Sequence, residues 1–217
     1  FQVIPNVVDT TIFSPPFSFE KGHSLRRILF VGLLVPVKGV PYLFQALTKL
    51  NQKRSDWHLD IIGDGPARAE YQRLASDLSI DERVTFHGLK HKQDVAEFMR
   101  QADLFVLPSL AETFSTVAAE ALTMGIPVLA TQSGGPEEFI NEEIGLLVPP
   151  GDAEALFNGL DYMLNHLKRF KPDQISRYAT ERFSPERVGE QLHKIYLECI
   201  EKYKGSYGTA TQTRTYQ

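Results

Sequence analysis

The sequence predicts an α/β protein whose core is a doubly wound parallel β-sheet with helices on both faces. Short apolar runs alternate along the chain with longer amphipathic stretches, the order expected of repeated βα units. Most of these runs are continuously apolar, as in strands that are covered on both faces. At 217 residues, of which 42% are hydrophobic, the chain is long enough to bury such a core without disulfides or metals.

Strands and helices are expected to alternate. In chain order, the predicted strands are Arg27–Leu34, Trp57–Gly63, Arg83–Gly88, Leu104–Ser109, Ile126–Thr131 and Gly145–Val148. The predicted helices are Val40–Gln52, Ala67–Leu78, Gln93–Ala102, Thr116–Met124 and Pro185–Lys202. Pro66 suits the start of the second helix, and Gly125 ends the fourth. The last helix is amphipathic, and it either closes the domain or crosses to a neighbour.

Composition and charge exclude several classes of function. A formal net charge of -4 and a pI near 5.9 provide no basic field for nucleic acid. Cys199 is the single cysteine, so the chain has no internal disulfide, which fits a reducing cytoplasm. No apolar run approaches the roughly 18 residues that are needed to cross a bilayer.

The ends of the chain predict its domain organisation. We expect one domain over residues 1–203, followed by a polar, disordered tail over residues 204–217. The opening stretch, FQVIPNVVDT, lacks a methionine and resembles a link that leads out of a preceding segment. We therefore expect the chain to be a piece of a longer protein.

The carboxyl ends of the strands are the expected ligand-binding rim of such a sheet. This rule places four loops on one rim: Leu34–Gly39, Gly63–Pro66, Ser109–Ser115 and Gln132–Glu138. Lys38 and Gly39 lie where the first of these loops enters a helix, and a lysine beside a helix N-terminus suits a phosphate. From spacing alone, a solvated surface lysine is the commoner explanation.

Two of these loops contain glycines followed by a proline. IIGDGP, with Gly63 and Gly65, is a tight turn more often than a binding loop, and Arg68 stands where a dinucleotide fingerprint has its third glycine. SGGPEEF is expected to start a helix, with Glu137 and Glu138 in a first turn where acids complement the helix dipole.

The titratable residues indicate neither a metal site nor a covalent nucleophile. His87 and His91 flank one loop and are expected to lack a nearby acid or cysteine, so no metal site is predicted. No Gly-x-Ser-x-Gly turn or cysteine–histidine pairing is present.

The stretch LPSLAETFSTVAAEALTMG, residues 107–125, places Glu112 in a loop and Glu120 in the helix that follows. If this helix begins near Ser115, its free amides face the rim and can hold a phosphate, while the carboxylates accept hydrogen bonds from hydroxyl groups. A sugar nucleotide offers a diphosphate and diols together. The alternative is that both glutamates are solvated surface charges, and spacing alone leaves the two explanations evenly balanced, although Glu120 lies among small apolar residues.

A resemblance to a known family shifts this balance. Seven stretches occur in a matching order and at compatible spacing: IPNVVDT, VGLLVPVKG, IIGDGP, RVTFHG, LPSLAETFSTVAAEALTMGIPVLAT, GGPEEFI and GLLVPPGD. Together they resemble the C-terminal, donor-binding domain of retaining GT-B glycosyltransferases of the family-four, glycosyl transferases group 1 type. The resemblance covers about residues 3–203. It implies a Rossmann-like domain that is one half of a two-domain enzyme.

The resemblance assigns roles to individual residues. Glu112 and Glu120 match the acids of an E-x7-E motif, so Glu112 would contact hydroxyls of the donor sugar and Glu120 the ribose hydroxyls. Lys38 would neutralise the diphosphate, which makes Lys38 and Glu112 the implied catalytic residues. The other implied donor-binding residues are Gly32, Gly63, Gly65, Thr113, Phe114, Ser115 and Thr116.

Three departures from the family pattern are visible. Leu33 replaces an arginine that normally shares the phosphate charge with the lysine. Val7 replaces a glycine of the first stretch. Thr113 and Ser115 replace the usual glycines on either side of Phe114.

The implied reaction is metal-independent, retaining transfer of a hexosyl group from a nucleotide-diphosphate sugar, without a cofactor, to a saccharide or lipid-linked acceptor. The last helix would cross to an N-terminal domain that binds the acceptor, so this piece alone is expected to be inactive. The whole enzyme is expected in the cytoplasm, with peripheral association at the inner face of the membrane, in polysaccharide or glycolipid biosynthesis. A sugar-nucleotide epimerase, a phosphorylase and a non-catalytic nucleotide-sugar-binding module are the alternatives, and Leu33 favours the last.

Overall fold

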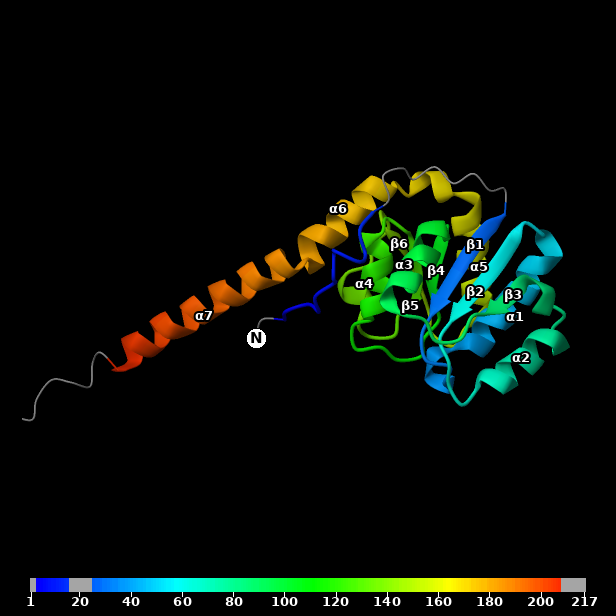
Figure 1. Ribbon diagram of the computed structural model, residues 1–217, viewed down its shortest axis with the longest axis horizontal. Helices are drawn as coiled ribbons and strands as arrows, with labels where there is room; N and C mark the ends of the chain where they lie inside the picture. The colour runs from blue at the N-terminus through cyan, green and yellow to red at the C-terminus, as the bar shows by residue number, and fades with distance from the viewer. Residues whose placement is uncertain (1–2, 16–24, 208–217) are drawn as a thin grey trace, which may run out of the picture.

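The computed structural model describes residues 3–15 and 25–207, with side chains up to residue 203. The described residues are built around a parallel sheet. Its strands lie in the order β3-β2-β1-β4-β5-β6. Their bounds are β1 (Arg26–Val31), β2 (Trp57–Ile62), β3 (Val84–Phe86), β4 (Leu104–Leu107), β5 (Val128–Thr131) and β6 (Gly145–Val148). The chain order reverses between β1 and β4, the place where doubly wound sheets bind ligands. The predicted doubly wound, Rossmann-like α/β class is confirmed (Figure 1).

Helices cover both faces of the sheet (Figure 1). They are α1 (Val40–Lys53), α2 (Arg68–Asp77), α3 (Lys92–Gln101), α4 (Thr116–Thr123), α5 (Ala153–Asn165), α6 (Pro172–Phe183) and α7 (Pro185–Tyr207). Single 3-10 turns occur at Pro36–Lys38, Asp81–Arg83, Pro136–Glu138 and Leu167–Arg169. α1 packs against α5 and α2, whereas α4 packs against α6 and α3 lies over β1.

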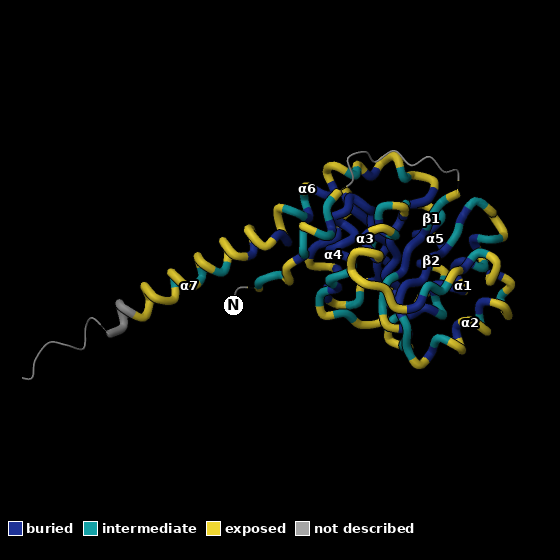
Figure 2. Tube along the Cα trace, in the orientation of Figure 1, coloured by how far each residue is buried: buried dark blue, intermediate teal, exposed yellow. Residues whose placement is uncertain are grey.

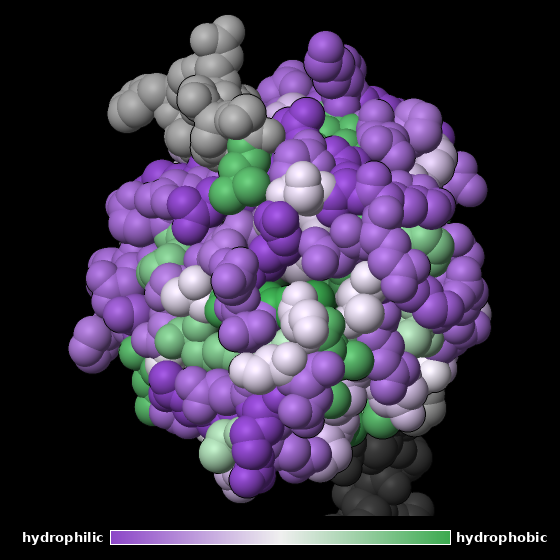
Figure 3. Space-filling view, turned by 90° about the vertical axis from the view of Figure 1, so that its right-hand side faces the viewer, coloured by the Kyte–Doolittle hydropathy of each residue, from purple (hydrophilic) through white to green (hydrophobic). Residues whose placement is uncertain are grey.

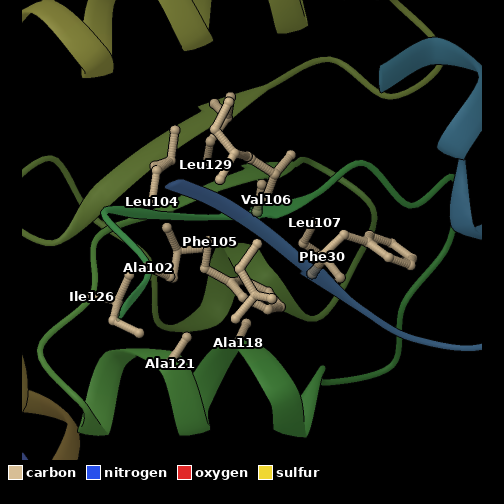
Figure 4. Packing of buried hydrophobic residues seen from close by; sticks show 14 of the residues in the cluster. Phe30, Ala102, Leu104, Phe105, Val106, Leu107, Ala118, Ala121, Ile126 and Leu129 are labelled. Atoms are coloured by element: carbon tan, nitrogen blue, oxygen red, sulfur yellow. The ribbon is translucent and has the colours of Figure 1, made fainter. Parts of the chain in front are cut away.

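The core lies between the sheet and these helices, and its central strands are buried on both sides (Figure 2). All four residues of β4 are buried. Phe105 of β4 points towards Ala118 and Ala121 of α4, whereas Leu104 and Val106 lie on the opposite face (Figure 4). This two-sided burial explains why the strand is continuously apolar in the sequence.

Several elements differ from their predicted extents. α5 and α6 were not predicted, although Asp152 caps the first of them by accepting hydrogen bonds from the N–H groups of Glu154 and Ala155, each at 2.9 Å. The helix expected from SGGPEEF is wrong, because only the 3-10 turn Pro136–Glu138 forms there. α7 continues through Tyr207, four residues into the segment for which we predicted disorder. The rest of that segment, 208–217, lies outside the described residues.

α7 extends away from the sheet and its packed helices (Figure 1). Four large side chains on it are between 48% and 65% exposed: Tyr196, Leu197, Ile200 and Tyr203. Among the described residues, no helix is both long enough and apolar enough to span a bilayer. On the side of the molecule that includes β3 and α2, the surface is mostly hydrophilic with small apolar patches (Figure 3).

Candidate active site

The four predicted loops meet at one rim of the sheet, as expected. Backbone hydrogen bonds join them in pairs: Leu34 N to Asp64 O (2.9 Å), Leu110 N to Val37 O (2.8 Å), Glu112 N to Ser133 O (2.8 Å) and Gly135 N to Glu112 O (2.9 Å). The loops after β1, β2, β4 and β5 are therefore one connected surface around the point where the strand order reverses.

Lys38 and Glu112 form the central contact of this surface. Gly39 has φ of +66°, and a Cβ atom there would lie 1.9 Å from the carbonyl oxygen of Pro108, so only glycine lets the two loops approach so closely. This approach brings Lys38 Nζ to 2.6 Å from Glu112 Oε1. Ser109 Oγ donates a second hydrogen bond, 2.8 Å long, to the same carboxylate oxygen.

The N-terminus of α4 faces the same rim. Ser115 precedes its first residue and has φ of +72°, a left-handed conformation that is rare outside glycine. No described residue accepts a hydrogen bond from the N–H groups of Phe114, Ser115 or Thr116. These amides and the positive end of the helix dipole can bind an anion.

A backbone contact and the packing of an aromatic ring hold the loop before α4 in place. A Cβ atom on Gly135 would lie 2.4 Å from Phe114 N, so these two backbone segments are in direct contact. The Phe114 ring packs against Phe139 and Phe183, with ring centroids 5.2 and 5.6 Å away. Thr113 is exposed, so its side chain faces solvent at the rim.

The remaining implied donor-binding residues surround this centre. Gly32 and Gly63 lie where the loops after β1 and β2 touch, and Gly65 contacts the backbone of Leu34 in the same way. Thr116 Oγ1 accepts a hydrogen bond from Asn6 Nδ2 at 3.4 Å.

Glu120 lies in the second turn of α4 and is only 7% exposed. Burial raises the pKa of its carboxyl from 4.5 to about 7, Lys92 lowers it and Asp9 raises it. No described residue forms a hydrogen bond or an ion pair with this carboxyl group. The interpretation of Glu120 as a solvated surface charge is therefore wrong. Its proposed contact with ribose remains a prediction.

Leu33 is 55% exposed at the rim, where the family pattern has an arginine. Arg68, the first residue of α2, is paired with Asp64, with Nη1 2.8 Å from Oδ2. Because position 33 is exposed at the rim, an arginine there would have its charge at the rim, whereas Leu33 contributes no charge.

Two features of the site were not foreseen from the sequence. Ser109 is fully buried and touches Glu112, but a serine after a strand has no special pattern. The expectation that His87 has no acid nearby is wrong, because its Nε2 lies 2.7 Å from Asp60 Oδ1. Asp60 also pairs with Arg27 at 2.8 Å, so the network joins β1, β2 and the residue that follows β3. Strand register, which the sequence does not display, brings these residues together.

Known proteins resemble most of this chain. A family model described as glycosyl transferases group 1 matches residues 15–182. An uncharacterized glycosyltransferase of Methanocaldococcus jannaschii is 30% identical over 217 aligned residues, which include 92% of this chain and 55% of the relative. The sucrose-phosphate synthase from Thermosynechococcus elongatus is 28% identical with a TM-score of 0.78, and the match covers 93% of this chain and 53% of that one.

A protein from Anabaena, solved in complex with UDP-glucose, has the same fold at 22% identity and a TM-score of 0.77, over 91% of this chain and 57% of its own. The chain spans about half the length of the curated relatives that it matches. The family match covers most of the sequence, and the sheet order, the rim loops and the solved structures agree with it. The chain therefore belongs to the glycosyl transferases group 1 family and has the fold of one half of a GT-B glycosyltransferase.

Proposed function

We propose that this chain is the donor-binding half of a retaining hexosyltransferase that uses a nucleotide-diphosphate sugar and requires neither a metal nor a cofactor. The observation that carries the proposal is the convergence of Lys38, Glu112 and the free amides of residues 114–116 where the strand order reverses. A cation with free amides suits a diphosphate, and a fixed carboxylate suits sugar hydroxyls.

Each group has a separate role in the proposed reaction. As the bond between the anomeric carbon and the phosphate lengthens, negative charge grows on the leaving diphosphate. Lys38 and the amides at the start of α4 stabilise this charge, an electrostatic contribution that is already in place before the reaction. Glu112 orients the sugar, and Glu120 accepts hydrogen bonds from the ribose hydroxyls. The departing phosphate helps to deprotonate an acceptor that attacks from the same face, so the anomeric configuration is retained.

The acceptor site belongs to the rest of the protein in this proposal. The matched relatives are about twice as long as this chain, so an N-terminal domain is expected. The exposed apolar side chains of α7 are the surface that we assign to its docking. The acceptor is a saccharide or a lipid-linked sugar, and the full enzyme acts in the cytoplasm or at the inner face of the membrane. This half alone transfers no sugar.

Nucleotide binding by the 217-residue chain is the first test. Calorimetry with UDP, GDP and ADP is expected to show binding of at least one of them, and the sugar nucleotide with the same base should bind as well. The Anabaena structure and the family membership support this choice of ligands. If none of the three nucleotides binds at millimolar concentration, the proposed function is wrong.

Transfer by the full-length protein is the second test. Glu112→Ala is expected to lower kcat/KM on the order of 10²-fold, as the loss of one preorganised transition-state contact does. Glu143→Ala, at an exposed position, is the matched control and should leave kcat/KM unchanged. A Glu112→Ala enzyme with the wild-type kcat/KM would show that Glu112 has no role in the reaction.

A non-catalytic nucleotide-sugar-binding module is the second candidate, and Leu33 is the observation that favours it. Without a cation at this exposed rim position, the diphosphate receives less charge stabilisation. Nucleotide binding without transfer or donor hydrolysis by the full-length protein would support the module. Analysis of the products by NMR would separate transfer from epimerisation or phosphorolysis.

A further inference from the structure

The carboxylate of Glu112 is held asymmetrically. Lys38 Nζ and Ser109 Oγ both donate to Oε1, at 2.6 and 2.8 Å. Within the described residues, no group donates to Oε2. The side chain is 9% exposed, so its orientation is determined by these two partners and by packing. One oxygen is therefore fixed by the protein and the other is free for a ligand hydroxyl.

The two donors differ in mobility and in charge. Lys38 has a long side chain that is 25% exposed, and its positive charge is attracted by any phosphate that enters the site. Ser109 is fully buried and lies two residues after the end of β4. Its carbonyl oxygen accepts a hydrogen bond from the hydroxyl of Thr131, a fully buried residue at the end of the neighbouring strand β5. The serine is thus anchored to the sheet, whereas the lysine can change partner.

This difference matters in the proposed reaction. A diphosphate beside Lys38 competes with Glu112 for the ammonium group, because both are anions. When the lysine turns to the phosphate, Glu112 loses one of its two donors at the moment when it must orient the sugar. Ser109 is neutral and buried, so the phosphate does not draw it away.

We propose that Ser109 is a positioning residue that keeps Glu112 Oε1 fixed during catalysis and leaves Oε2 for a hydroxyl of the donor sugar. This inference rests on the proposed function of the site. It concerns a residue that touches Glu112 and has no assigned contact with the donor.

A double-mutant cycle in the full-length protein tests the role of Ser109. Ser109→Ala is expected to lower kcat/KM for sugar transfer about tenfold, the effect of losing one hydrogen bond to a charged group. The same substitution in a Glu112→Ala background should cause almost no further loss, because the serine acts through the glutamate. Affinity for the nucleoside diphosphate alone should not change, since Ser109 does not face the phosphate in this proposal.

Ser176→Ala is the matched control. Ser176 is also a buried serine, and its hydroxyl donates to Thr123 O at 2.7 Å, away from the rim. Both serine variants should lose thermal stability to a similar degree, but Ser176→Ala should keep the wild-type kcat/KM.

Two outcomes would overturn the inference about Ser109. One is an unchanged kcat/KM in Ser109→Ala, and the other is a loss that persists in full when Glu112 is already alanine. A wild-type protein that neither binds a nucleotide nor transfers sugar gives a different result, because it contradicts the proposed function and the role of Ser109 with it.

Discussion

At the scale of single residues, burial changes the protonation of Glu120. Its carboxyl group lies inside the protein at 7% exposure, and burial raises its pKa from 4.5 to about 7. At pH values between 4.5 and about 7, the folded protein therefore keeps a proton on Glu120 that the unfolded chain has released. As a result, the free energy of unfolding falls as pH rises through this window.

The expected size of this effect is on the order of 3 kcal/mol between pH 4.5 and pH 8. Glu120→Gln should remove most of this dependence and should be more stable than the wild type at pH 8. Urea unfolding at pH 5 and pH 8 measures the free energy of unfolding of the wild type and of Glu120→Gln. Glu143→Gln, at an exposed glutamate, should keep the wild-type profile. A Glu120→Gln profile parallel to the wild type would show that another group titrates.

Ser115 is a second residue under local strain. Its φ of +72° is a glycine-type conformation, and its hydroxyl is buried without a partner among the described residues. Ser115→Gly is therefore expected to raise the free energy of unfolding by about 1 kcal/mol, after the greater flexibility of glycine in the unfolded chain is subtracted.

Ser79→Gly separates the two causes of strain at Ser115. Ser79 also has a positive φ, of +55°, but it is exposed, so this variant relieves the backbone without removing a buried hydroxyl. Its gain should be the smaller one in denaturant unfolding. A loss of stability in Ser115→Gly would mean that its side chain has a stabilising contact.

Leu33 offers a gain-of-affinity prediction. Leu33→Arg places a cation at an exposed position of the rim, and the affinity for a nucleoside diphosphate should rise about fivefold to tenfold. Leu197→Arg on α7 is the control, because that residue is exposed to a similar extent but lies away from the rim. Calorimetry in low salt compares the two variants. Equal affinities would show that position 33 is too far from the phosphates.

At the scale of elements, the tight contacts between loops determine the geometry of the site. Gly135 lies against the backbone of Phe114, and a Cβ atom there would overlap Phe114 N at 2.4 Å. Gly135→Ala must therefore displace the loop that leads into α4. We expect donor affinity to fall at least tenfold and the melting temperature to decrease.

Gly189→Ala is the matched control, since a Cβ atom at this exposed position of α7 meets no atom within 4 Å. It should leave donor binding unchanged and add about 1 kcal/mol of stability from helix propensity. If Gly135→Ala binds donor normally, the loop before α4 is more adaptable than these contacts indicate.

The sequence predicted the secondary-structure elements better than the contacts between side chains. All six strands of the sheet were predicted, most of them from continuous apolar runs such as LFVL, because burial on both faces leaves a strong pattern. The rim loops followed from the rule for parallel sheets. In contrast, the pairs Ser109–Glu112 and Asp60–His87 depend on side-chain directions and strand register, which no local pattern records. Leu33 was recognised only because the family resemblance supplied the missing arginine for comparison.

At the scale of the whole molecule, α7 extends away from the sheet and has an exposed apolar stripe (Figure 1). Tyr196, Ile200 and Tyr203 follow helical spacing, and Leu197 lies beside them on the same face. The matched relatives are about twice as long as this chain, so the rest of such a protein is the occupant that we expect on this stripe.

The pair of substitutions Leu197→Asp and Ile200→Asp tests this docking. The melting temperature of the 217-residue chain should hardly change, because both residues are exposed. In the full-length protein, small-angle scattering should show a larger radius of gyration, and transfer should decrease. Gln191→Asp with Glu198→Asp, on the opposite side of the helix, should have neither effect. If the first pair of substitutions changes neither the radius of gyration nor the transfer rate of the full-length protein, the partner docks elsewhere.

The contact between Lys38 and Glu112 has a consequence for how this protein can be studied. The two residues are 74 positions apart, on loops that follow strands adjacent only in the finished sheet. Unfolding that separates β1 from β4 separates Lys38 from Glu112, so the complete site exists only in the folded sheet. Ligand binding is then linked to global unfolding, and at a hundredfold excess over Kd a donor should stabilise the fold by about 2.7 kcal/mol. A melting curve alone can therefore rank candidate sugar nucleotides by affinity.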